Sequence, residues 1–141
     1  MEMSVLTTET SAVKVHPNRL RFMYVYTIIT AGILGLGFLV APSTMLSALV
    51  MPPEEQYLAG IAYSVWFAFG ILSALGLRSP VKFAPLLLLQ LTYKLTWFAA
   101  IIIPHAVTGQ LPTFAITMSA LYVTIVIGDI AAIPWRYIFA K

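Results

Sequence analysis

The chain has 141 residues, of which 60% are hydrophobic and 9% are charged. Soluble globular domains carry roughly 25% charged residues, so this composition excludes a soluble enzyme and a disordered chain. The absence of cysteine excludes a disulfide scaffold, a thiolate nucleophile and Cys-ligated metal sites. The class that remains is an integral membrane protein.

Four segments stay apolar over the roughly 20 residues that a helix needs to cross a bilayer. They are, in chain order, residues 20–40, 57–77, 81–103 and 113–133. Prolines and polar residues separate them and mark their ends. We therefore expect an all-α integral membrane protein: an antiparallel four-helix transmembrane bundle. It forms a single membrane domain over residues 20–134, with cytoplasmic tails at 1–19 and 135–141.

Residues 43–51, which follow the first span, are too few to cross a membrane. Met45, Leu46, Leu49 and Val50 recur there at helical spacing, and prolines bound the segment. This pattern predicts a short amphipathic interfacial helix on the outer face. Such a helix either caps the bundle or gates a cavity beneath it.

The positive charges predict the orientation of the spans. Seven of the eight Lys and Arg residues precede the first span, lie between the second and third, or follow the fourth. The loop after the first span carries Glu54 and Glu55 instead. By the positive-inside rule, both termini lie in the cytoplasm. The Lys and Arg residues that orient the spans account for the net charge of +3, so we expect no nucleic-acid partner.

Small residues recur along the first two spans, where they let helices approach closely. We expect these residues to pair the two spans as a hairpin. They are Ala31, Gly32, Gly35 and Gly37 in the first span and Gly60, Ser64, Ala68, Gly70 and Ala74 in the second.

Two charged residues lie well inside the predicted spans, away from the span ends. Lys94 is near the middle of the third, where a charge costs about 2.5–3.5 kcal/mol on insertion scales, and Asp129 is in the fourth. Counted from the connecting loop, their levels differ by about seven residues, or roughly 10 Å. Their side chains lean toward each other, because helical side chains point toward their own N-terminus. We predict a Lys94–Asp129 contact, either direct or through water or Gln90.

Polar and aromatic residues share faces of the second, third and fourth spans, and these faces are expected to converge in the bundle. One interpretation is a midplane pocket for a small amphipathic or anionic molecule, with Lys94 as its charge partner. The other is structural: the buried pair fixes helix packing in an accessory or homo-oligomeric membrane subunit. The candidate binding residues are Trp66, Gln90, Tyr93, Lys94, Trp97, Tyr122 and Asp129.

The sequence contains no catalytic motif, nucleotide-binding loop or metal-ligand spacing. His16 and His105 are predicted on opposite sides of the membrane, so they cannot share a metal or a haem. We therefore predict no catalytic residue, metal or cofactor, and an enzyme is not favoured.

The order of features resembles the DoxX-like group of small bacterial four-helix membrane proteins. The first span ends in Ala41-Pro42, a short apolar helix follows, and a Gly-rich second span ends in Leu77-Arg78-Ser79-Pro80. The resemblance implies a multi-pass protein of the bacterial plasma (inner) membrane. Because some members of that group are linked to quinone-coupled sulfur oxidation, it also implies a third function, a quinone-linked membrane redox component.

Overall fold

The computed structural model describes residues 14–53 and 55–141, and their secondary structure is entirely helical. Four helical segments are long and apolar enough to cross a membrane: Pro17–Val40, Gln56–Gly76, Ala84–Val107 and Thr113–Ala132. These helices confirm the prediction of a helical, multi-pass membrane protein by length and composition. Residues 1–13 of the predicted N-terminal tail, and Glu54, lie outside the described residues.

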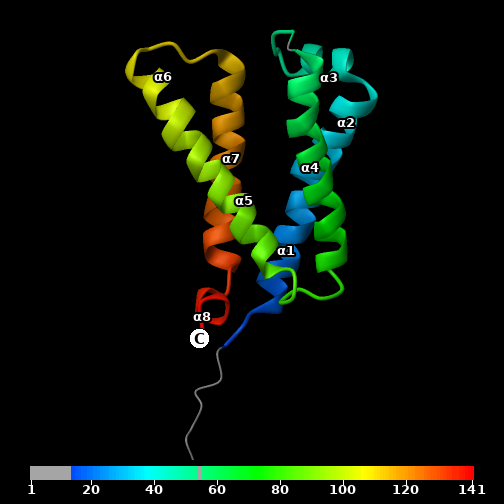
Figure 1. Cartoon of the computed structure of the whole chain (residues 1–141), viewed down its shortest axis with the longest axis vertical. Coiled ribbons are helices and arrows are strands. Elements are labelled where there is room, and N and C mark those ends of the chain that lie inside the picture. Colours follow the sequence, from blue (N-terminus) through cyan, green and yellow to red (C-terminus); the bar gives the residue numbers. More distant parts are fainter. Residues whose placement is uncertain (1–13, 54) are drawn as a thin grey trace, which may run out of the picture.

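The helices form two pairs (Figure 1). The first helix pair comprises α1 (Pro17–Thr27), the π-helical η1 (Ile28–Ile33), α2 (Leu34–Val40) and α4 (Gln56–Gly76), with the short α3 (Pro42–Ala48) between α2 and α4. The second helix pair comprises α5 (Ala84–Trp97), the π-helical η2 (Phe98–Ile102), α6 (Ile103–Val107) and α7 (Thr113–Ala132), followed by α8 (Trp135–Ile138). Figure 1 shows α3 and α6 at one end of the molecule and α8 with the start of α1 at the other. The two pairs spread apart toward the α3/α6 end.

Local chemistry sets the helix ends, which differ from the predicted span ends by a few residues. The first helix begins at Pro17 rather than at residue 20, because proline fits the first helical position. At the start of α4, the Glu55 carboxylate accepts the backbone N–H groups of Tyr57 at 2.9 Å and Leu58 at 2.6 Å. This cap satisfies donors that a helix N-terminus leaves free.

The third span was expected to stop before Pro104, and that expectation is wrong. Its last part, α6, runs through Pro104 to Val107. Proline in a regular helix leaves the carbonyl four residues earlier unpaired. The wider turns of η2 end at Ile102, two residues before Pro104, and include Ala100, whose carbonyl the proline leaves unpaired, so the chain remains helical across Pro104.

The predicted short helix is present as α3, but it ends earlier than expected. Leu49 and Val50 lie beyond it, and Val50 has a φ of 53°, in the left-handed region that stops a helix. Met45 of α3 packs against Gly37 of α2, since a Cβ added at Gly37 would lie 3.0 Å from the Met45 sulfur. The short helix therefore packs on the first helix pair.

Glycines bring the two helices of the first pair into close contact, as the small residues predicted. A Cβ added at Gly32 would lie 2.9 Å from the Gly70 Cα, and one at Gly35 would lie 2.8 Å from the Tyr63 carbonyl oxygen. Gly60 differs, because a Cβ there meets nothing within 4 Å. Ser64 and Ala68 are exposed as well. The prediction that this Gly60 stripe also joins the first span is wrong.

The two helix pairs share one layout. In both, a π-helical segment interrupts the first helix and a single long helix follows. Buried positions match at a constant spacing of 67 residues in the first helices, namely Leu20 with Leu87, Thr27 with Lys94 and Gly35 with Ile102. In the second helices the spacing is 56 residues, namely Phe69 with Ile125, Ser73 with Asp129 and Gly76 with Ala132. Four of the five buried polar residues among those described thus occupy matching positions in the two halves, and Gln90 matches the apolar Met23.

The two pairs pack together mainly in the half of the molecule near α8. Leu20 and Tyr24 of α1, Leu87 and Leu91 of α5, and Ile125 of α7 belong to one buried cluster there. The Tyr24 hydroxyl donates to the Pro80 carbonyl at 2.6 Å. This hydrogen bond links α1 to the segment that connects the two pairs. The pairs are therefore in contact in the α8 half and diverge from there.

Candidate functional site

Lys94 is fully buried on α5, at the level where the two helix pairs meet. Its ammonium Nζ donates a hydrogen bond to the Tyr93 hydroxyl at 2.6 Å. The same nitrogen lies 4.7 Å from the centre of the Tyr122 ring, within the range of a cation–π interaction. The positive charge is therefore held by a phenol and an aromatic ring.

Asp129 is also fully buried, on α7, and its partner is Gln90 of α5. Gln90 Nε2 lies 3.1 Å from Asp129 Oδ2 and 3.4 Å from Oδ1, and 3.2 Å from the Thr27 hydroxyl of α1. One amide therefore joins three helices. Its own carbonyl, Gln90 Oε1, is buried without a hydrogen-bond partner.

The direct form of the predicted Lys94–Asp129 contact is wrong. Within the part of the chain that the structure describes, no ion pair joins the two residues, and the Lys94 ammonium bonds to Tyr93 instead. The physical reason is the level difference along the helices. Gln90 lies one turn closer to Asp129 than Lys94 does, and it binds the carboxylate that Lys94 was expected to reach.

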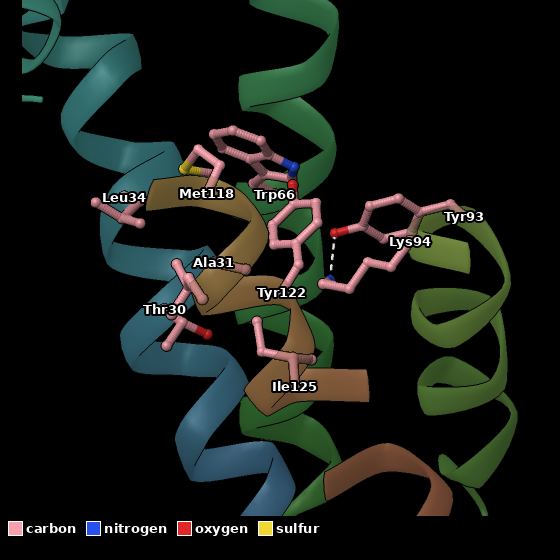
Figure 2. A pocket seen from close by; sticks show the side chains of 10 residues that line it. Thr30, Ala31, Leu34, Trp66, Tyr93, Lys94, Met118, Tyr122 and Ile125 are labelled. Carbon is pink, nitrogen blue, oxygen red and sulfur yellow. Dashed lines mark hydrogen bonds between the residues drawn. The ribbon is translucent and has the colours of Figure 1, made fainter. Parts of the chain in front are cut away.

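Aromatic side chains surround the lysine. The Tyr122 ring packs edge-to-face against Tyr93, at 6.3 Å between centroids, and against Trp97, at 5.1 Å. Figure 2 shows Tyr122 between Trp66 of α4 and Lys94, with the Lys94–Tyr93 hydrogen bond drawn as a dashed line. The predicted convergence of three helix faces is thus seen for Trp66, Tyr93, Lys94 and Tyr122.

These residues line a small cavity of about 10 Å³. That volume accommodates about one water molecule. The same side chains surround about 230 Å³ of atom-free space, part of which is open to the surroundings. The centre therefore has room for a water molecule beside Lys94 and is not sealed. The lining residues are Thr30, Ala31, Leu34, Trp66, Tyr93, Lys94, Met118, Leu121, Tyr122 and Ile125.

The predicted site residues divide into two groups. The first group lines the cavity and comprises Trp66, Tyr93, Lys94 and Tyr122. Trp97 does not line the cavity but packs against the Tyr122 ring. Gln90 and Asp129 form the neighbouring hydrogen-bonded group, which does not line it. These two groups are named the lysine centre and the carboxylate centre below.

The sequence prediction missed the contribution of the first helix. Thr27 belongs to the carboxylate centre, and Thr30, Ala31 and Leu34 line the cavity. Two threonines three residues apart inside a span are no signal for this contact, because a threonine hydroxyl can bond to its own helix. Thr30 donates to the Tyr26 carbonyl at 2.8 Å, so its hydroxyl is satisfied on its own helix.

The histidines lie away from both centres. His105 is on α6, where its Nδ1 lies 2.7 Å from the Ile101 carbonyl oxygen, and His16 precedes α1 at the opposite end. Among the residues that the structure describes, no group of three His, Asp or Glu side chains is placed to hold a metal ion.

Comparison with known proteins gives no relative: no protein-family model, curated protein or solved structure matches the chain. The resemblance to the DoxX-like group therefore stays a prediction.

Proposed function

We propose that the chain is an antiparallel four-helix bundle of the bacterial plasma membrane, with both termini in the cytoplasm and α3 at the outer surface. The distribution of charge supports this orientation. Arg19 and Arg21 of α1, Arg78 and Lys82 of the connection to α5, and Arg136 of α8 all belong to segments at the α8 end. Positive residues are retained on the cytoplasmic side.

We further propose that the lysine centre binds the anionic group of a small amphipathic molecule. The observation that supports this most strongly is that Lys94 is fully buried and bonded to a phenol, while the nearby Asp129 carboxylate interacts with it only electrostatically and bonds to Gln90. A buried ammonium without a directly bonded carboxylate is costly in a membrane. An anionic ligand group supplies that direct contact.

The residues around Lys94 suit the rest of such a ligand. The Tyr93 hydroxyl accepts from the ammonium and orients it toward the cavity. Trp66, Tyr122 and Leu34 offer apolar walls for a hydrocarbon chain. Because the enclosed cavity has room for only about one water molecule, the anionic group reaches the ammonium from the adjoining open space. The chain then extends into the open space adjoining the cavity.

The test uses the full chain in phosphatidylcholine nanodiscs and the fluorescence of Trp66 and Trp97. Dibromostearate, an anionic amphipath that quenches tryptophan, is titrated against the wild type and against Lys94→Met. We expect saturable quenching of the wild type and an affinity lower by about tenfold or more in the variant, equivalent to roughly 1.4 kcal/mol. The background is Trp135→Phe, which removes the tryptophan of α8.

The matched probe is dibromostearyl alcohol, which has the same chain without the charge. It is expected to quench wild type and Lys94→Met alike, because only the carboxylate pairs with the ammonium. Equal affinity of the two proteins for the carboxylate contradicts a role for Lys94 as the counter-ion.

A second candidate function is structural, and the carboxylate centre favours it. Gln90 bonds to residues of α1 and α7, so it fixes three helices relative to one another. Interhelical hydrogen bonds of this kind contribute about 0.6 kcal/mol on average in a membrane. On this alternative the chain is an accessory or self-associating membrane subunit, and replacement of Lys94 changes the stability of the fold without changing ligand binding.

A further inference from the structure

A second hollow lies at the α8 end of the molecule, away from the lysine centre. It has a volume of about 350 Å³ and lies where the chain enters α1 and leaves α7. Four basic residues line it, from both ends of the described chain: Lys14, His16, Arg19 and Arg136. Its remaining walls are the segment Ile130 to Trp135.

Among the side chains that the structure describes, the basic residues of this hollow have no acidic partner. The side chains of Lys14, Arg19 and Arg136 are exposed, and none has a hydrogen-bond or ion-pair partner within the described part of the chain. Of the described Asp and Glu side chains, Asp129 is buried against Gln90 and Glu55 caps α4 at the far end. The hollow therefore attracts an anion.

An apolar groove adjoins the basic hollow. It has a volume of about 400 Å³ and lies between α1 and α7, along Phe22, Met23 and Gly128. The two spaces share Arg19, Ala131 and Ala132 as lining residues. A basic hollow at the end of membrane-spanning helices thus continues into an apolar groove along them.

We propose that this combined site binds one anionic glycerophospholipid, with its phosphate in the basic hollow and an acyl chain in the groove. Lys and Arg residues next to a membrane attract anionic headgroups, and basic pockets between helices recognise them. The groove selects a lipid over free phosphate, because it offers apolar surface for a hydrocarbon chain. Trp135 lies at the rim, 38% exposed, where interfacial tryptophans anchor proteins at headgroup level.

The test is native mass spectrometry of the full chain in detergent, with dioleoyl phosphatidylglycerol or dioleoyl phosphatidylcholine added. We expect the wild type to retain phosphatidylglycerol in preference to phosphatidylcholine. The double variant Arg19→Gln/Arg136→Gln loses that retention by roughly tenfold or more. Ala131→Trp, which keeps every basic residue and places a bulky ring at the exposed position where hollow and groove meet, loses it too.

The matched control is Arg78→Gln/Lys82→Gln. It removes the same charge at the same end of the molecule from residues that line neither space. We expect this control to retain phosphatidylglycerol as the wild type does. Equal loss in the control overturns the proposal, since the attraction is then a property of net charge alone.

Two further arms separate the alternatives. Inorganic phosphate is added in excess, and displacement of phosphatidylglycerol by it overturns the proposal in favour of a free-phosphate site. Lys94→Met is expected to retain phosphatidylglycerol, because the lysine centre is a different site. Failure of either proposal is therefore distinguishable from failure of the other.

Circular dichroism of each variant shows whether the helices remain folded. Ala131→Trp and the Arg19/Arg136 variant test the site independently.

Discussion

Gln90 binds the Asp129 carboxylate, with its Nε2 3.1 Å from Oδ2. The buried acid is therefore bonded to an amide. The buried base, Lys94, lies one helical turn beyond Gln90 on α5 and bonds to the Tyr93 hydroxyl. Two charged residues in one membrane domain thus belong to two centres. The carboxylate centre joins helices, and the lysine centre faces a cavity.

This division predicts which pairs of residues are energetically coupled. Gln90→Leu is expected to lower the free energy of unfolding by about 1–3 kcal/mol, because it leaves a buried carboxylate without a donor. In double-mutant cycles with Asp129→Leu, Gln90 is expected to show a coupling of about 1 kcal/mol, and Lys94→Leu less than about 0.5 kcal/mol. Unfolding in mixed micelles of increasing SDS content measures both.

The opposite order of coupling energies contradicts the division. If Lys94 and Asp129 are coupled more strongly than Gln90 and Asp129, the two charges act as one structural ion pair, and the lysine is not available to a ligand.

The contact between Gly32 and Gly70 predicts a sharp difference between two glycine substitutions. Gly32→Ala places a Cβ 2.9 Å from the Gly70 Cα, so the backbones of α4 and η1 must separate. We expect a loss of about 1–3 kcal/mol of unfolding free energy. Gly60→Ala is the control, since its Cβ meets nothing within 4 Å. Equal destabilisation by both in the same SDS titration contradicts this packing.

The hydroxyl of Tyr93 is predicted to hold the lysine ammonium in place. Tyr93→Phe removes the acceptor of the 2.6 Å hydrogen bond and keeps the ring. We expect affinity for dibromostearate to fall several-fold, consistent with about 1 kcal/mol for one hydrogen bond. Tyr137→Phe, exposed on α8, is the control and is expected to bind as the wild type does. Unchanged affinity in Tyr93→Phe excludes the positioning role.

The orientation is testable because the chain has no cysteine. Single cysteines are introduced at Ser47 of α3, at Thr108 after α6, and at Ser79 between the two helix pairs. In spheroplasts, a membrane-impermeant maleimide is expected to label Ser47→Cys and Thr108→Cys, and to label Ser79→Cys only after lysis. Labelling of Ser79→Cys in intact spheroplasts contradicts the proposed orientation and places this connection on the outer side of the membrane.

The sequence was sufficient to predict the four helices that are long and apolar enough to cross a membrane, because length and hydropathy alone decide which segments suit a bilayer. It also identified the helix faces that bring Trp66, Lys94 and Tyr122 together, because helical periodicity is rigid. Glycine spacing identified the contact of Gly32 and Gly35 with α4.

The sequence does not determine which buried side chains bond to one another inside the bundle. Gln90 and Lys94 lie on one face of α5, one turn apart, and counting residues from a loop cannot decide which of them meets Asp129. That choice depends on the rotation of α7 and on side-chain rotamers. Thr27 was missed for another reason: a threonine inside a span can satisfy its hydroxyl on its own backbone, so its presence does not signal an interhelical contact. The π-helical segments η1 and η2 leave no periodic signal either.

Native mass spectrometry of the chain, released gently from its own membrane, tests most directly whether Lys94 holds an anionic amphipathic molecule. The wild type is expected to carry one bound single-chain anionic amphipath, which Arg19→Gln/Arg136→Gln retains and Lys94→Met loses. A wild-type protein without such a bound mass, or the same bound mass on Lys94→Met at equal occupancy, contradicts a ligand at the lysine centre.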